Sequence, residues 1–206
     1  LAFLRFMRRV RRERFDLVIN LHRNERASAL AAFSGAKRIV GYAKPLFSIF
    51  FDKVMENKKA VKHQIHSHFD VLRDAVGIRR IDDGGLEMWL PEEAERSAAA
   101  LWQKSFAEDR KVIALNIGAS WKTKRWLDGF FAETADHFIE RGCGIAFFGG
   151  PMDEELVTAC RAKMRHGASA ELQVFTGRVR LAELAALLKR CALFITTDSG
   201  PMHVGV

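Results

Sequence analysis

The residues best suited to chemistry follow an apolar segment late in the sequence and read Thr196-Thr197-Asp198-Ser199-Gly200-Pro201-Met202-His203. The apolar run at 191–195 predicts a buried strand, and Pro201 stands where the first turn of a helix would begin. A strand that turns through small residues into a helix start presents backbone N–H groups and the positive end of the helix dipole to an anion. The pattern therefore predicts a phosphate-binding turn, with Asp198 or Ser199 as the helix cap.

A second segment, residues 118–126, combines small and basic side chains directly after another apolar run. Gly118 and Ser120 would let a ligand approach the backbone and a hydroxyl group closely. Lys124 and Arg125 supply positive charge that can balance a diphosphate through charge-assisted hydrogen bonds. A solvated surface loop is the alternative, but small and basic residues together after a buried strand favour phosphate binding.

Two further loops have weaker but compatible patterns. Residues 149–155 read GGPMDEE, in which Glu154 or Glu155 would either favour a helix dipole or accept hydrogen bonds from ribose hydroxyls. Thr176 and Gly177 follow a third predicted strand and could line a base or ribose pocket. The sequence contains no Gly-x-Gly-x-x-Gly after a strand and no Walker-type Gly-Lys-Ser/Thr, which argues against a nicotinamide or flavin dinucleotide fold and against a P-loop.

All of these loops come after segments that predict strands, and helices separate the strands. In the second half, strands are expected at 112–117, 145–148, 172–175 and 193–196, and helices at 128–141, 153–165 and 181–190. In the first half, we expect a basic helix ending near residue 12, helices at 24–33, 65–76 and 91–106, strands at 15–20 and 38–42, and a turn with a short strand within 77–91. This alternation predicts an α/β fold with mostly parallel sheets, in which the loops at the carboxyl edge bind ligands.

The composition is that of an ordinary globular protein with an uneven positive charge. Of the 206 residues, 49% are hydrophobic and 28% are charged, and the net charge is +8. Much of the excess lies in one early segment, at Arg5, Arg8, Arg9, Arg11, Arg12 and Arg14. We interpret this segment either as a solvated helix face or as a basic surface for anionic lipid or a phosphorylated acceptor. No motif predicts nucleic-acid binding.

The cysteine and histidine residues are not spaced in a way that indicates a metal or cofactor site. The three cysteines are scattered and favour a reducing compartment, and His63, His66 and His68 are expected to spread around a helix start. We therefore predict no metal site and no cofactor.

Together, these motifs resemble the family 9 glycosyltransferases, which are the bacterial ADP-heptose:lipopolysaccharide heptosyltransferases. The matching pieces are GAS at 118–120, KRW at 124–126, FGGP at 148–151, TG at 176–177 and DSGPMH at 198–203, with further similarity at 15–23 and 34–42. The resemblance covers nearly the whole chain and implies a GT-B-like fold of two Rossmann-like domains, an acceptor-side domain at 1–100 and a nucleotide-sugar-binding domain at 101–206. Both domains are expected to be incomplete, the first without its first strand and loop and the second without its last helices.

The resemblance also implies roles for individual residues. Lys124 matches the basic residue that contacts the donor diphosphate, and Asp198 with the backbone of Ser199 and Gly200 matches the phosphate-binding turn. The full donor-binding set is Gly118, Ser120, Lys124, Arg125, Glu154 or Glu155, Thr176, Gly177, Asp198, Ser199, Gly200 and His203, and the acceptor or sugar side contains His22, Arg23 and Arg26. The catalytic base of the family is an Asp expected upstream of residue 1, so no catalytic residue is assigned and the chain alone is expected to be inactive.

The implied reaction is inverting transfer of heptose from ADP-heptose to the inner core of lipopolysaccharide. The implied location is cytoplasmic, with peripheral contact to the anionic inner face of the inner membrane as one interpretation of the basic helix. Two alternatives stay open: another GT-B enzyme that uses a UDP- or GDP-sugar, and a non-catalytic module that binds a nucleotide. The sequence carries no signal for the acceptor, its linkage position or the oligomeric state.

Overall fold

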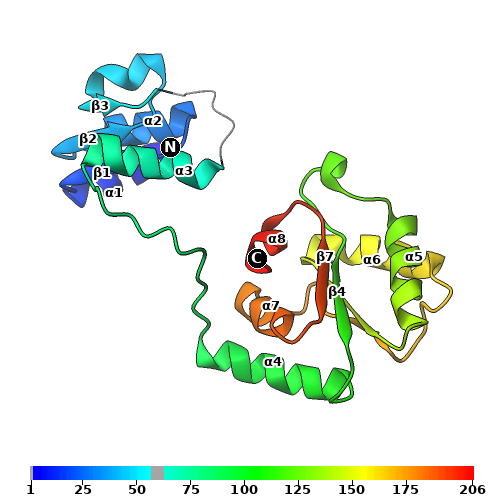
Figure 1. The fold of residues 1–206 in the computed structure, drawn as a ribbon. Helices are drawn as coiled ribbons and strands as arrows, with labels where there is room; N and C mark the ends of the chain where they lie inside the picture. The colour runs from blue at the N-terminus through cyan, green and yellow to red at the C-terminus, as the bar shows by residue number, and fades with distance from the viewer. Residues whose placement is uncertain (1, 57–62) are drawn as a thin grey trace. The chain divides into compact units, whose positions relative to one another are not determined.

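The computed structural model describes residues 2–56 and 63–206, which form two compact units, Leu1–Gly84 and Gly85–Val206 (Figure 1). The units divide after Gly84, whereas the sequence-based boundary at residue 100 falls inside helix α4 (Glu92–Ser105). This helix belongs to the second unit because Ala98 and Trp102 share a core cluster with Leu184 and Leu187 of that unit.

The first unit contains a parallel three-stranded sheet in the order β1-β2-β3. Its elements are α1 (Ala2–Arg12), β1 (Leu17–Asn20), α2 (Glu25–Ala32), β2 (Arg38–Gly41), the 3₁₀ helix η1 (Pro45–Phe50), β3 (Lys53–Val54), α3 (Gln64–Asp70) and the π-helix η2 (Val71–Val76). Successive strand residues point to opposite faces, so Ile39 packs with Ala31 and Phe51 while its neighbour Val40 packs with Val71. The sheet is therefore covered on both faces.

The second unit contains a parallel four-stranded sheet in the order β6-β5-β4-β7. Its strands are β4 (Val112–Asn116), β5 (Gly144–Phe148), β6 (Leu172–Val174) and β7 (Leu193–Thr196). The helices besides α4 are η3 (Lys122–Lys124), α5 (Asp128–Ile139), η4 (Pro151–Asp153), α6 (Glu154–Lys163), α7 (Leu181–Leu188) and α8 (Gly200–Val204). Every residue of β4 and β5 is buried, as expected for central strands covered by helices on both faces.

Several details of the first half differ from the sequence-based expectation. No strand forms within residues 77–91, where Leu86 and Trp89 are exposed and meet no neighbouring strand. The expected single helix at 65–76 divides into α3 and η2, and the short elements η1 and β3 were not predicted. A two-residue strand is too short to produce a periodic pattern. No helix in the described part of the chain is both long enough and apolar enough to cross a bilayer.

Candidate functional site

Four loops of the second unit leave the sheet at the same edge. Asn116, the last residue of β4, is level with Phe148 of β5 and Thr196 of β7, and Phe147 is level with Val174 of β6. We call the loops that follow these four strand ends, residues 117–125, 149–153, 175–178 and 197–200, the strand-end cluster. Ligands of open parallel sheets bind at this edge, so the predicted phosphate loops do come together.

An ion pair links two of these loops. The Lys124 Nζ atom lies 2.7 Å from Asp198 Oδ2, and both side chains are about half exposed. The hydrogen bond from Lys124, helped by its charge and by that of His203, lowers the pKa of the Asp198 carboxyl group. The pair therefore holds a lysine and a carboxylate at the centre of the cluster, where a phosphate could replace the carboxylate as the partner of Lys124.

A buried amide at the end of β4 organises the same two loops, and the sequence analysis did not identify it. The Asn116 Nδ2 atom donates to Ser199 Oγ at 3.0 Å, to Thr196 Oγ1 at 3.1 Å and more weakly to Gly118 O at 3.4 Å. The buried Thr197 hydroxyl also donates to Gly118 O. The sequence did contain one indication of this role, because Asn116 is a polar residue at the end of an otherwise apolar strand.

The structure confirms Ser199, one of the two predicted cap residues, as the N-cap of α8, but not a side-chain cap. The Ser199 side chain makes no capping hydrogen bond. Its hydroxyl instead accepts from Asn116 and donates to Thr197 O at 3.3 Å. The Asp198 side chain pairs with Lys124 instead of capping the helix.

A second carboxylate that the sequence analysis overlooked shapes the middle of the cluster. Asp153 Oδ2 accepts the backbone N–H of Gly150 at 2.9 Å. A Cβ atom on Gly118 would lie directly on the Asp153 carboxyl group, so only glycine allows the two loops to approach this closely. Of the two predicted acids, Glu154 lies beside Gly177, where an added Cβ would be 2.5 Å from Glu154 Oε1. Glu155 is exposed on α6.

The other residues predicted to bind the donor differ in their exposure and in their hydrogen-bond partners. Arg125 Nε donates to Ala119 O at 2.9 Å, so this guanidinium fastens its own loop. The Thr176 side chain is buried, and its hydroxyl donates at 3.5 Å to Phe147 O. Ser120, Gly200 and His203 are exposed at the rim of the cluster. Trp126 packs on Phe130 and Phe131, with ring centroids 5.5 and 5.0 Å away, so this residue of the KRW motif contributes to packing.

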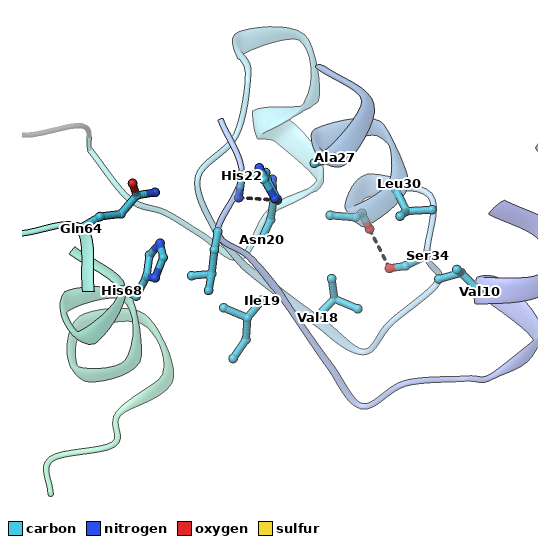
Figure 2. A pocket seen from close by; sticks show the side chains of 12 residues that line it. Val10, Val18, Ile19, Asn20, His22, Ala27, Leu30, Ser34, Gln64 and His68 are labelled. Atoms are coloured by element: carbon cyan, nitrogen blue, oxygen red, sulfur yellow. Dashed lines mark hydrogen bonds between the residues drawn. The ribbon is translucent and has the colours of Figure 1, made fainter. Parts of the chain in front are cut away.

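The three residues predicted for the acceptor side lie in the first unit and line two different pockets. His22 lines a largely apolar pocket of about 520 Å³ between β1, α2 and α3, and its backbone N–H donates to Asn20 Oδ1 at 3.2 Å (Figure 2). Arg23 and Arg26 line a separate pocket of about 470 Å³ together with Lys44. The Arg23 guanidinium carbon lies 4.2 Å from the centre of the Tyr42 ring, a cation–π contact that orients it.

Comparison with known proteins establishes the family. The family model described as glycosyltransferase family 9 (heptosyltransferase) matches residues 3–206. The chain belongs to glycosyltransferase family 9.

Individual relatives agree with this result. The family 9 glycosyltransferase of Veillonella parvula is 35% identical, with a TM-score of 0.86 over 99% of this chain and 59% of that one. The structure of the Escherichia coli ADP-heptose LPS heptosyltransferase II is 21% identical, with a TM-score of 0.79 over 98% of this chain and 63% of that one. Lipooligosaccharide heptosyltransferase 2 of Haemophilus influenzae is 25% identical over an alignment of 203 positions that covers 94% of this chain and 58% of the relative. This family 9 chain thus spans roughly three-fifths of these relatives.

The likeness to these structures confirms the predicted GT-B-like class with mostly parallel sheets. Within this family 9 chain, Lys124 and Asp198 form an ion pair, Gly118 lies against the carboxyl group of Asp153, and Gly177 lies against that of Glu154. Among the described residues, no group of three or more His, Cys, Asp or Glu side chains is placed to hold a metal ion.

Proposed function

We propose that this chain is part of a heptosyltransferase that moves heptose from ADP-heptose to the inner core of lipopolysaccharide with inversion. The observation that carries the proposal is the Lys124–Asp198 ion pair at the strand-end cluster of a family 9 chain. The relative from Haemophilus influenzae is named as a lipooligosaccharide heptosyltransferase, and the Escherichia coli structure as an ADP-heptose LPS heptosyltransferase. The second unit would bind the donor, and the first would bind the acceptor.

In the proposed donor complex, Lys124 leaves Asp198 and contacts the diphosphate of ADP-heptose. Its positive charge stabilises the ADP leaving group as the bond to the sugar breaks, which is where negative charge develops in the reaction. Asp198 and the backbone of Ser199 and Gly200 position the turn against the phosphates, with His203 at its rim. Gly118, Ser120 and Arg125 form the opposite wall.

The nucleoside would extend from the diphosphate toward β5 and β6. Glu154 or Glu155 accepts hydrogen bonds from the ribose hydroxyls, and the loop of Thr176 and Gly177 lines the adjacent surface. All of these residues bind and orient the donor. We assign the base that deprotonates the acceptor hydroxyl to none of them.

The acceptor would be an anionic sugar, held in the first unit. Arg23, Arg26 and Lys44 line one pocket, so a carboxylate or phosphate of the acceptor finds three cations there, and Glu25 is the one acid among the described residues that line it. His22 would contact the sugar from the neighbouring pocket.

The acceptor's lipid anchor implies a location at the cytoplasmic face of the inner membrane, with peripheral association. Helix α1 supports this proposal because it carries Arg5, Arg8, Arg9, Arg11 and Arg12 and has no buried residue. Such a helix is attracted to anionic headgroups over a Debye length.

Calorimetric titration with ADP, UDP and GDP tests the donor assignment. We expect selective binding of ADP by the wild-type chain and weaker binding by Lys124→Ala. Selective binding of UDP or GDP would instead indicate a GT-B enzyme with another donor. Absence of nucleotide binding by a folded chain would contradict a donor site in the second unit.

A further inference from the structure

The 3₁₀ helix η1 (Pro45–Phe50) has one packed edge and one exposed edge. Residues three apart are aligned in a 3₁₀ helix, so its side chains form rows. Phe47 and Phe50 form the row that contacts Phe33, with ring centroids 6.2 and 5.4 Å from that of Phe33, and Phe50 is 43% exposed. Leu46 and Ile49 form the other row and are 76% and 82% exposed. We call Leu46 and Ile49 the aliphatic ridge.

Positive charge lies beside the ridge. A pocket of about 500 Å³ is lined by Leu46 and Phe47 of η1, by Phe3 of α1 and by the two cations Arg26 and Lys44. The adjoining pocket shares these two cations and adds Arg23. Glu25 lines both pockets and is the one acid to do so in the part of the chain that the structure describes. Around the ridge, cations therefore outnumber acids.

The base of η1 is held firmly enough to present the ridge as a fixed feature. Pro45 at its first position presets the backbone for a helical turn, and the Ser48 hydroxyl donates to Pro45 O at 2.8 Å. The Lys44 N–H donates to Ser28 Oγ of helix α2 at 3.1 Å, which ties the start of η1 to the body of the unit. The exposed leucine and isoleucine thus project from a packed turn.

We propose that the aliphatic ridge inserts into the interfacial region of a bilayer that contains anionic phospholipid. This inference rests on the membrane association proposed above and names the element that makes the contact. Two large aliphatic side chains beside a cationic rim complement a membrane surface, where apolar groups enter the acyl boundary and cations stay among the headgroups.

Vesicle co-sedimentation of the whole chain tests this contact, with vesicles of phosphatidylethanolamine plus phosphatidylglycerol compared with phosphatidylcholine alone. The ridge variant is Leu46→Ser with Ile49→Ser. The control is Leu86→Ser with Leu181→Ser, which removes two aliphatic side chains that are 65% and 57% exposed in the second unit. We expect the ridge variant to lose at least about tenfold in partitioning to anionic vesicles, while the control keeps wild-type partitioning.

A charge variant, Arg26→Gln with Lys44→Gln, distinguishes the electrostatic part of the membrane contact from the apolar part. We expect its partitioning to anionic vesicles to fall at low salt, with a smaller difference from wild type at high salt, because screening weakens only the electrostatic part. Equal binding of wild type and ridge variant, or equal losses in ridge and control variants, would overturn the proposal. So would a folded wild-type chain that sediments with neither kind of vesicle.

The same samples are titrated with ADP. Wild-type ADP affinity in the ridge variant shows that the second unit is intact, and an unchanged far-ultraviolet circular dichroism spectrum shows that the first unit is folded. If no variant or wild-type sample binds ADP while the vesicle results hold, the donor assignment fails and the membrane contact stands.

Discussion

The Lys124 ammonium group lies 2.7 Å from the carboxylate of Asp198, and this contact joins the loops that follow the neighbouring strands β4 and β7. Both side chains are about half exposed, so water screens the pair and it contributes little to stability. A weak pair can exchange partners at low cost. The ion pair therefore keeps Lys124 at the sheet edge and leaves it available to a phosphate.

Replacement of Lys124 by alanine should weaken ADP binding at least about tenfold, because a charge-assisted hydrogen bond to the diphosphate is lost. Adenosine, which has no phosphate, should bind the variant and the wild type equally. Calorimetric titration of both ligands measures the difference. Lys122→Ala is the matched control, since Lys122 is an exposed lysine of the same short helix. A similar loss in the control would indicate a general effect of charge and would contradict a specific role for Lys124.

Replacement of Asn116 by alanine should also weaken ADP binding, although this amide is 1% exposed and lies behind the loops. Loss of its hydrogen bonds to Thr196 and Ser199 releases the turn that carries Asp198, and the fold should lose about 1–3 kcal/mol. The control is Asn20→Ala, which removes the amide that ends β1 of the first unit and donates to Tyr42 O. Denaturant unfolding should show destabilisation in both variants, whereas ADP titration should show weaker binding only for Asn116→Ala. If Asn116→Ala bound ADP with wild-type affinity, the Asn116 amide would not be needed to position the binding site.

Replacement of Gly177 by alanine should destabilise the second unit by about 1–2 kcal/mol or more, because its backbone has a φ of +70° that L-residues avoid. The added Cβ would also lie 2.5 Å from Glu154 Oε1 and 3.3 Å from Pro151 Cα. All four tryptophans of the chain belong to the second unit, so tryptophan fluorescence during denaturant unfolding measures this unit selectively. Gly129→Ala is the control, because nothing lies within 4 Å of its added Cβ and alanine favours the helix α5. Equal stability of the two variants would contradict the proposed strain.

The second unit was largely predictable because its strands are short apolar runs separated by helices with clear start and stop residues. The expected strand at 193–196 agrees with β7 (Leu193–Thr196), and the expected helix at 24–33 in the first unit agrees with α2 and its N-cap Asn24. Because parallel strands end at one edge, the strand-end loops could be predicted to meet. The particular contact of Lys124 with Asp198 also requires β7 to lie beside β4, an order that the local sequence pattern does not contain.

The contacts of Asn116 and Asp153 were not predictable in the same way. Asn116 and Ser199 are 83 positions apart, and they meet because β7 pairs with β4 and not with β6, which precedes it in the chain. Strand order is not encoded in local periodicity. Likewise, helix α4 looked like part of a domain boundary until its packing against α7 placed it in the second unit. The sequence therefore indicated which residues lie at the edge, but not which partners hold them.

The pH dependence of stability should be strongest where a carboxylate accepts hydrogen bonds in the core, as Glu183 does. Its oxygens accept the Arg180 N–H and the Ser97 hydroxyl, each at 2.8 Å, which joins α7 to α4. These bonds, the one from the Arg180 N–H first, lower the pKa of Glu183 below its ordinary value of 4.5. The ionised form is therefore favoured by folding, so its stabilisation is present above that value and is lost as the pH falls through the lower folded pKa.

We therefore expect the second unit to lose stability between about pH 5 and pH 3, measured by tryptophan fluorescence during thermal unfolding. Glu183→Gln should be less stable than wild type at neutral pH by about 1–2 kcal/mol, because hydrogen bonds to a charged group become neutral ones. Its midpoint should then change less across the acidic interval, since the titrating group is gone. Glu133→Gln, on the exposed side of α5, should keep the wild-type profile. If Glu183→Gln showed the same acid dependence as wild type, the loss of stability would have to come from other carboxylates, and the junction of α4 and α7 would not be the pH-sensitive element.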